Sequence, residues 1–163
     1  YMDDFFYTGK KVQTTGQRAA LTIDELKAIR QQASSGPKKL DIWVTYYTML
    51  LDLHLQDYLK LIDVLTIWTW NSEDLKKLES NFRRIEALGP HLRKTQGCYF
   101  FDYTLRKPLT VADMKYQCEM GLEWLRQGKI EGMVFLGNSA TDQGYECVEW
   151  TRNWIQKVGD IPV

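Results

Sequence analysis

The stretch DVLTIWTWNSEDLKKLESNFRRIEALGP, residues Asp63 to Pro90, contains both halves of a βα unit. Its first part, Asp63 to Trp70, is almost continuously apolar, β-branched or aromatic, which is typical of a strand buried on both faces. Asn71 and Ser72 can cap a following helix, and Gly89-Pro90 can end it. Between these ends, apolar side chains recur at helical spacing, at Leu75, Leu78, Phe82 and Ile85. The stretch therefore predicts one strand followed by one helix.

The same alternation of short apolar runs and longer helical segments extends along the whole chain. Further strands are predicted at Tyr1–Tyr7, Asp41–Tyr47, Cys98–Tyr103 and Gly132–Gly137. Helical segments are predicted from Thr22 to Gly36, from Met49 to Lys60, from Thr110 onward and from Asp142 to Val158, and a polar loop is predicted at Lys10–Ala20. This order predicts an α/β fold with five consecutive βα units around a parallel sheet.

Two architectures arrange βα units around a parallel sheet: an open doubly wound sheet and a βα barrel. A dinucleotide-binding sheet needs a glycine-rich turn such as GxGxxG after its first strand, and YTGKKVQTTG, residues 7–16, does not provide one. A complete barrel has eight units and about 250 residues. The 163 residues are therefore expected to form a single domain, residues 1–163, that is part of a barrel. Because Tyr1 already lies within a strand-like run, we expect this chain to be a piece of a longer polypeptide.

Composition argues against several classes of partner and site. Lysine plus arginine equals aspartate plus glutamate, 21 against 21, without a block of either sign, so neither nucleic acid nor an anionic membrane is an expected partner. No apolar run reaches the roughly 18 to 20 residues of a membrane span. The three cysteines, Cys98, Cys118 and Cys147, are too far apart for a zinc motif and odd in number for a disulfide framework. No metal and no cofactor is expected, and the compartment stays open.

Carboxylate, amide and aromatic side chains gather where the predicted strands end. In both architectures the carboxyl ends of the strands carry the functional site. The candidates at these ends are Asp3, Asp4, Tyr47, Trp70, Asn71, Glu73, Asp102, Tyr103 and Asn138. This mixture suits a sugar, because aromatic faces cover its C–H patches while carboxylates and amides bond its hydroxyls.

Two carboxylates across a cleft are the minimum for cleavage of a glycosidic bond, and Asp102 with Asp3 or Asp4 is the candidate pair. Adjacent residues of a strand point to opposite faces, so at most one of Asp3 and Asp4 is expected to face the barrel axis. Glu73 lies in the first turn of a predicted helix, where a negative charge complements the helix dipole. That position gives Glu73 a structural reading beside the functional one.

Several stretches also resemble a known family. YMDDFFYTG, LTIWTWNSEDL, GCYFFDY, GKIEGMVFLGN and ECVEWTRNWIQKVGD resemble the later half of TIM-barrel glycoside-hydrolase-like proteins, including bacterial ones with no assigned substrate. The resemblance covers most of the chain and implies that its strands are the fourth to eighth of a barrel, with the first three absent. It also implies a catalytic carboxylate after the fourth strand, here Asp3 or Asp4, and a second one later, here Glu73 or Asp102.

The large retaining clan with this layout uses glutamates at both positions, whereas this chain has aspartates. Side-chain length sets the gap between the carboxylates, about 5 Å for retention and about 6.5 to 9.5 Å for inversion, so the stereochemistry stays open.

The sequence thus predicts a glycoside hydrolase in which Asp102 and Asp3 or Asp4 share the acid and the nucleophile-or-base roles. Tyr47, Trp70, Asn71, Glu73, Tyr103 and Asn138 would bind the carbohydrate. One alternative is a non-catalytic carbohydrate-binding or scaffold barrel. Another is a barrel or doubly wound enzyme that binds a phosphate-containing substrate at GNSATDQG, residues 137–144. Open sheet edges further predict association with a missing N-terminal barrel segment or with a second copy.

Overall fold

The structure of the protein is a computed structural model that describes residues 1–6 and 19–162, except for the side chains of residues 138 and 139. Most of the predicted loop Lys10–Ala20 and the end of the first predicted strand lie outside the described residues.

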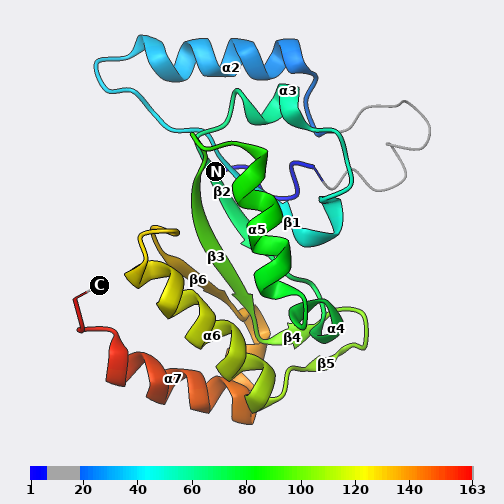
Figure 1. The fold of residues 1–163 in the computed structure, drawn as a ribbon, viewed down its shortest axis with the longest axis vertical. Coiled ribbons are helices and arrows are strands. Elements are labelled where there is room, and N and C mark those ends of the chain that lie inside the picture. The colour runs from blue at the N-terminus through cyan, green and yellow to red at the C-terminus, as the bar shows by residue number, and fades with distance from the viewer. Residues whose placement is uncertain (7–18, 163) are drawn as a thin grey trace.

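Four parallel strands form the central sheet, as the sequence predicts (Figure 1). They are β1 (Trp43–Tyr47), β2 (Val64–Trp68), β3 (Arg93–Tyr99) and β6 (Met133–Leu136), and they lie side by side in the order in which they occur in the chain. Pairing of strands in sequence order, with all strands parallel, is the arrangement found along the wall of a βα barrel. The structure therefore confirms an α/β fold with a parallel sheet that is consistent with part of a barrel.

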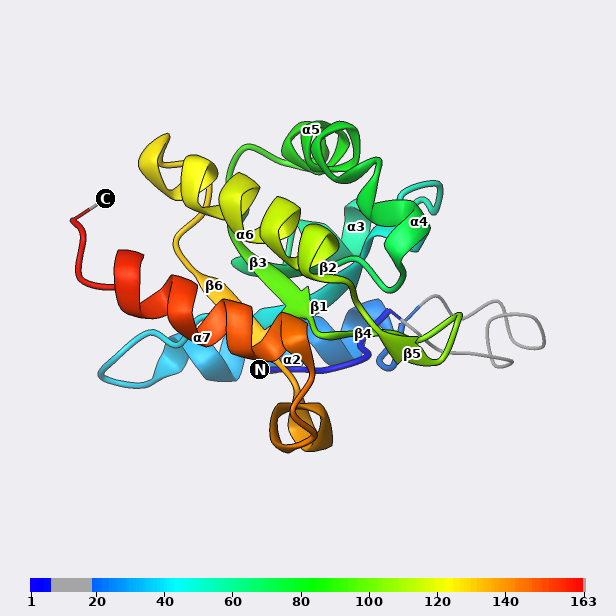
Figure 2. The ribbon, with the colours of Figure 1, turned by 90° about the horizontal axis from the view of Figure 1, so that it is seen from below.

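Helices precede, connect and follow these strands. They are α2 (Ile23–Ser35), α3 (Gln56–Leu59), α4 (Ser72–Leu75), α5 (Leu78–Leu88), α6 (Val111–Arg126) and α7 (Glu146–Val158). The helices α5 and α6 cover one face of the sheet, and α7 lies beside α6 (Figures 1 and 2). Stacking of Phe82 on Trp124, with ring centroids 3.9 Å apart, joins α5 to α6. Among the described residues, no helix is both long enough and apolar enough to span a membrane.

Local sequence signals account for where several helices begin. Thr22 and Glu25 form the expected capping box, in which the Thr22 amide donates to Glu25 Oε2 over 2.8 Å. Thr110 and Asp113 form a second capping box at the start of α6. These side chains satisfy amide groups that a helix leaves without an intrahelical acceptor.

The predicted strand Tyr1–Tyr7 is wrong over the described residues. Only Met2 pairs with the sheet: its amide donates to the Trp43 carbonyl and its carbonyl accepts from the Thr45 amide. The chain then turns, and Asp4 has a φ of 48°. The Asp3 carboxylate accepts from the Asp4 amide over 3.0 Å, and such a local bond competes with strand pairing.

Three other predicted elements also differ from the structure. The helix predicted after Asn71 is divided into α4 and α5, and the segment Met49–Lys60 contains only the 3-10 helix η1 (Thr48–Leu50) and α3 as regular structure. The strand predicted at Cys98–Tyr103 begins earlier, at Arg93, because the polar residues at its start pair with β2. Its last residues form β4 (Phe101–Asp102), which pairs antiparallel with β5 (Lys107–Pro108).

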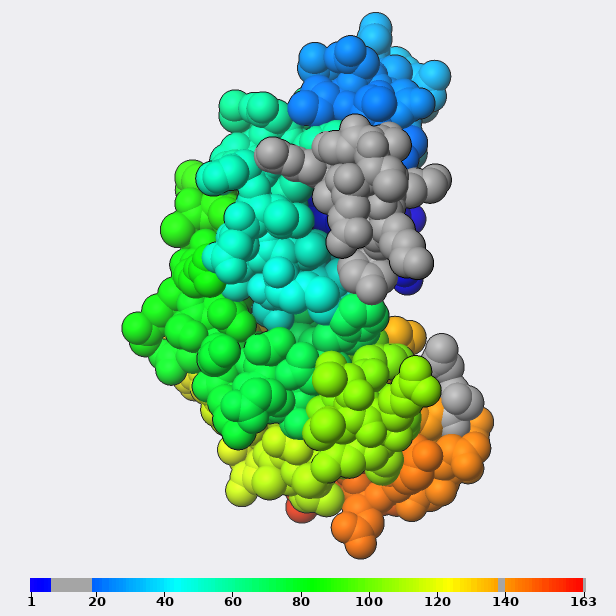
Figure 3. Space-filling model, turned by 90° about the vertical axis from the view of Figure 1, so that its right-hand side faces the viewer, coloured from blue at the N-terminus to red at the C-terminus, as the bar shows by residue number. Residues whose placement is uncertain are grey.

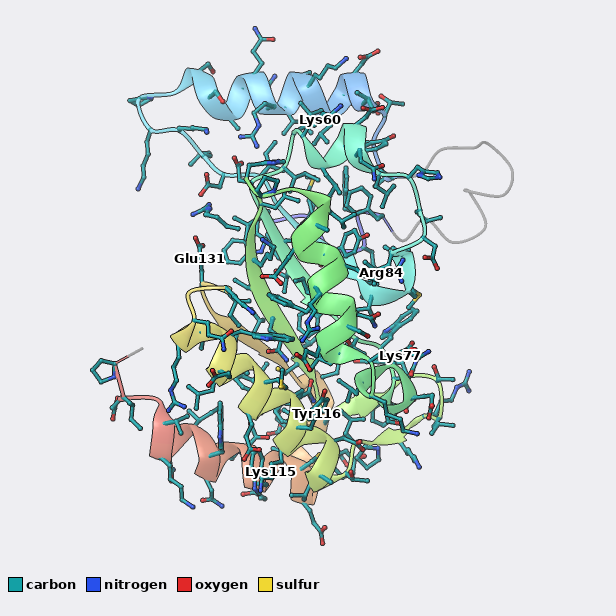
Figure 4. The ribbon with its side chains drawn as sticks, in the orientation of Figure 1. Lys60, Lys77, Arg84, Lys115, Tyr116 and Glu131 are labelled. Atoms are coloured by element: carbon teal, nitrogen blue, oxygen red, sulfur yellow. The ribbon has the colours of Figure 1, made fainter. Side chains whose placement is uncertain are left out.

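The loop that follows β1 is attached to α5. Arg84 Nη2 donates to Asp52 Oδ1 over 2.5 Å, and Arg84 is labelled on α5 in Figure 4. Both side chains are largely exposed, so this ion pair contributes little stability and mainly links the loop to the helix.

On the face of the sheet opposite α6, β2 and β3 make one unusually close contact. Gln96 of β3 points toward α6, where its Nε2 donates to the Gln117 carbonyl, so its neighbour Gly97 points to the other face. There the indole of Trp68, the residue paired with Gly97, covers the glycine. A Cβ atom on Gly97 would lie 2.1 Å from Trp68 Cδ2, so only glycine fits at this position.

Replacing Gly97 with alanine is expected to destabilise the fold by about 1–3 kcal/mol, because Trp68 must move. Urea unfolding measures this change. Gly36→Ala is the matched control, since its Cβ would lie 3.7 Å from its nearest neighbour, the Lys38 carbonyl oxygen. Equal unfolding midpoints for the two variants would show that the Trp68 contact is unimportant.

Candidate functional site

The segments that follow β1, β2, β3 and β6 meet on one face of the molecule. In the space-filling view they are the cyan, green, yellow-green and orange parts of the surface (Figure 3). This is the face expected for a site, because the carboxyl ends of parallel strands lie at the same edge of a sheet.

Four aromatic side chains contact one another at this edge, and we call Tyr47, Trp70, Tyr99 and Tyr103 the rim cluster. Tyr47 stacks on Trp70, with ring centroids 5.3 Å apart and planes 24° apart. The ring centroids of Trp70 and Tyr103 are 6.1 Å apart. Those of Tyr103 and Tyr99 are 4.9 Å apart, in an edge-to-face arrangement. Tyr103 is 42% exposed and Trp70 is half-buried, so their rings are accessible to a ligand.

Asp4 lies directly beside the rim cluster. The Tyr47 hydroxyl donates to Asp4 Oδ1, while Asp4 Oδ2 has no hydrogen-bond donor among the described residues. Burial, together with this bond to Asp4, raises the pKa of Tyr47 far above its ordinary value, so the hydroxyl stays protonated as a donor. Asp4 itself is exposed and adopts a left-handed backbone conformation, which aspartate tolerates better than most residues do.

Asp3 and Asp4 approach the same face of the sheet, which corrects the prediction that they point to opposite faces. Asp3 Oδ1 accepts from Thr45 Oγ1 over 2.6 Å, whereas Asp4 accepts from Tyr47. Thr45 and Tyr47 are two residues apart in β1 and therefore lie on one face. The turn at Asp3 and Asp4 makes this possible, because the alternation of a strand no longer applies there.

Asp102 is buried and fully hydrogen-bonded. Its Oδ2 accepts from the Ser72 amide and hydroxyl over 2.9 and 2.7 Å, and its Oδ1 accepts from the amides of Thr104 and Leu105 over 2.9 and 2.7 Å. Burial is the largest single influence and opposes ionisation, but the four bonds together outweigh it and hold the pKa of Asp102 below its ordinary value. The carboxylate therefore connects the end of β4 to the start of α4, and its catalytic role stays a prediction.

Asn71 and Glu73 also serve α4. Asn71 caps the helix, since its Oδ1 accepts from the Asp74 amide over 2.8 Å and its Nδ2 donates to Asp74 Oδ2 over 2.9 Å. Glu73 is exposed and pairs with Lys76 over 2.6 Å, and this bond lowers the pKa of Glu73. Both residues nevertheless line a hollow of about 370 Å³, together with Ser72, Asp74, Asp102, Thr104 and Leu105. This hollow adjoins the rim cluster, because Asn71 follows Trp70 and Thr104 follows Tyr103 in the chain.

The loop after β6 is only partly described. Asn138 begins the 3-10 helix η2 (Asn138–Asp142), and its side chain lies outside the described residues, so its predicted contact with sugar stays a prediction. In this loop η2 has only five residues, and the longer helix α7 begins after it, at Glu146, so phosphate binding at residues 137–144 stays a prediction. Within residues 1–6 and 19–162, no three His, Cys, Asp or Glu side chains are grouped closely enough to hold a metal ion.

Sequence reasoning missed Tyr99 and Thr45 as members of the site. Tyr99 is the last residue of β3, but the strand prediction placed that end at Tyr103. Because β3 begins with the polar residues Arg93 to Gln96, a search for apolar runs does not detect where the strand starts. A correct strand end would have added Tyr99 to the candidates.

We expect Asp102→Asn to lower the free energy of unfolding by about 1–3 kcal/mol at neutral pH, because an amide NH₂ would face a backbone donor. A folded-state pKa below the ordinary aspartate value of about 3.9 stabilises the protein above that pH. This contribution disappears as the pH falls through the lower folded-state pKa, so the parent and the variant should converge in acid. Thermal unfolding as a function of pH tests this, with the exposed Asp57→Asn as control. A gap that persists at the lowest pH would contradict it.

Comparison with known proteins supports the fold. The structure is similar to the PgaB (BpsB) glycoside hydrolase domain from Bordetella bronchiseptica, with a TM-score of 0.51 and 14% sequence identity. The similarity covers 86% of this chain and 42% of that one, so the chain spans less than half the length of the domain it matches. No protein-family model and no curated protein matches the chain. At this identity the likeness concerns the fold alone, and the chain has a glycoside-hydrolase-like α/β fold.

Proposed function

We propose that the chain belongs to a glycoside-hydrolase-like protein and binds carbohydrate across the rim cluster. The observation that carries this proposal is the continuous run of Tyr47, Trp70 and Tyr103 rings beside two exposed aspartates. The position of this run at the carboxyl ends of parallel strands supports it, as does the likeness to a domain described as a glycoside hydrolase.

The chemistry of the rim suits a sugar ring. Pyranose rings present C–H patches that pack against aromatic faces, and Trp70 and Tyr103 offer such faces. The equatorial hydroxyls of the sugar need hydrogen-bond acceptors, and the carboxylates of Asp3 and Asp4 lie at the same edge of the sheet. The hollow beside Asn71 and Thr104 would extend the contact to a neighbouring sugar unit.

Within this site we assign the reactive carboxylate to Asp4. Its Oδ1 accepts from the Tyr47 hydroxyl, and no donor among residues 1–6 and 19–162 bonds to Oδ2, the oxygen that we assign to the substrate. Asp3 already accepts from Thr45 and from the Asp4 amide through one oxygen and would be the second carboxylate, because Asp102 is committed to Ser72 and the turn after it. Hydrolysis of a glycosidic bond needs two such groups.

The hydrogen bonding of Asp102 favours a second candidate function, a carbohydrate-binding barrel without catalysis. Because four donors hold Asp102, the carboxylates left for catalysis are Asp3 and Asp4. These two are neighbours in one turn and not a pair across a cleft. In this case Asp3 and Asp4 would only accept hydrogen bonds from sugar hydroxyls. The two candidates share the rim cluster and differ in turnover.

Trp70→Ala is expected to weaken oligosaccharide binding at least tenfold, or about 1.4 kcal/mol, because it removes the central ring of the rim cluster. Isothermal titration calorimetry with glucose, N-acetylglucosamine and glucosamine oligomers measures the effect. Trp150→Ala is the matched control, since this tryptophan is also half-buried but lies on α7. Equal affinities of the Trp70 variant and the parent protein would refute the rim as the binding surface.

Asp4→Asn should reduce hydrolysis of the bound oligosaccharide by about 100-fold or more, because general acid–base groups typically contribute that much. Release of reducing ends measures turnover, calorimetry shows whether binding is kept, and Asp57→Asn serves as control. Undiminished turnover would show that Asp4 is not catalytic. Binding without turnover in both the parent and the variant would support the non-catalytic candidate.

A further inference from the structure

Two hydroxyl side chains of β1 bond to the turn that carries the two aspartates. Thr45 and Tyr47 are two residues apart in the strand and therefore lie on one face of the sheet. Thr45 Oγ1 donates to Asp3 Oδ1 over 2.6 Å, and the Tyr47 hydroxyl donates to Asp4 Oδ1. Within the described part of the chain, these hydroxyls are the only side-chain donors to the two aspartates. Each carboxylate is thus attached to β1 through one oxygen.

The two donors are much more firmly fixed than their acceptors. Thr45 and Tyr47 are buried, and both lie in a strand that pairs along its length with β2. The ring of Tyr47 is also stacked on Trp70. Asp3 and Asp4, in contrast, are exposed residues of a turn. Groups on strands hold a geometry more precisely than groups on loops do, so the strand hydroxyls can fix carboxylates that the turn alone would leave free to rotate.

The direction of both hydrogen bonds is fixed by the number of protons. A hydroxyl has one proton, and an ionised carboxylate has none to donate. Because Thr45 gives its proton to Asp3, it accepts from the Tyr1 hydroxyl, whose oxygen lies 2.8 Å from Thr45 Oγ1. Tyr47 keeps the proton that it donates to Asp4, since burial and this bond raise the pKa of Tyr47. Both strand hydroxyls therefore act as donors to the turn.

We propose that Thr45 and Tyr47 are positioning residues, each of which holds its aspartate by Oδ1 and leaves Oδ2 for the substrate. This inference rests on the proposed function of the site. It also changes the role expected of Tyr47, whose hydroxyl acts through Asp4 while its ring stays in the rim cluster. A carboxylate without its anchor spends part of its time in unproductive rotamers, which slows the reaction without weakening the binding of the sugar.

Thr45→Val and Tyr47→Phe each remove one hydroxyl and keep the shape of the side chain. Each variant should lower kcat about tenfold, because a hydrogen bond to a charged group typically contributes that much, and should leave KM nearly unchanged. Release of reducing ends measures both constants. The substrate is whichever of the glucose, N-acetylglucosamine and glucosamine oligomers the parent protein binds most tightly in calorimetry.

Thr66→Val and Tyr46→Phe are the matched controls, since both residues are completely buried. The Thr66 hydroxyl bonds to Trp43 and Thr95, and the Tyr46 hydroxyl donates to the Leu50 carbonyl, so neither hydroxyl bonds to an aspartate. The controls lose a buried hydroxyl but should keep kcat within about twofold of the parent value. A tenfold loss in the controls as well, or a parental kcat in the two β1 variants, would overturn the proposal.

Urea unfolding separates this inference from the proposed hydrolysis, because it needs no turnover. Thr45→Val is combined with Asp3→Asn, and Tyr47→Phe is combined with Asp4→Asn. In each pair the effects on the unfolding equilibrium constant should be non-additive by at least about twofold, as expected of side chains in contact. If the parent protein has no turnover, the proposed hydrolysis fails and these two cycles decide the positioning alone. Additive effects in either cycle would overturn it.

Discussion

The contact between Trp68 and Gly97 is the constraint on which the site depends. The indole lies where any side chain at position 97 would be, so β2 and β3 can pair closely only in a register that places a glycine there. That register brings Tyr99 onto Trp68, with ring centroids 4.4 Å apart, and aligns Tyr47 with Trp68 across β1 and β2. The rim cluster at the ends of these strands therefore follows from a glycine in the middle of the sheet.

Two turns complete the site, and aspartate side chains hold both of them. At the turn after Met2, Asp3 and Asp4 bond to Thr45 and Tyr47, which places two carboxylates on one face of the sheet. At the end of β4, Asp102 accepts hydrogen bonds from the start of α4 and from the turn that follows, and the Tyr103 amide donates to the Trp70 carbonyl over 3.2 Å. Asp3 and Asp4 present their carboxylates to solvent, whereas both carboxylate oxygens of Asp102 accept hydrogen bonds from the protein itself.

Much of the fold was predictable because its signals are local. Helical period and capping residues identified the starts of α2 and α6, and continuous apolar runs identified β1, β2 and β6. The prediction failed where a competing interaction acts. A local bond from Asp3 replaced strand pairing at the first residues, and pairing with β2 imposed a strand on the polar sequence that begins β3.

The sequence by itself determined the alternation of strands and helices, the parallel sheet and the kinds of side chain at the strand ends, since these follow from the spacing of residues close together in the chain. Only the tertiary structure decided which carboxylates are available. The bonds that distinguish Asp4 from Asp102 join residues 43 and 30 positions apart in sequence, Asp4 to Tyr47 and Asp102 to Ser72. Such contacts depend on strand register and turn geometry, which residue spacing along one segment does not specify.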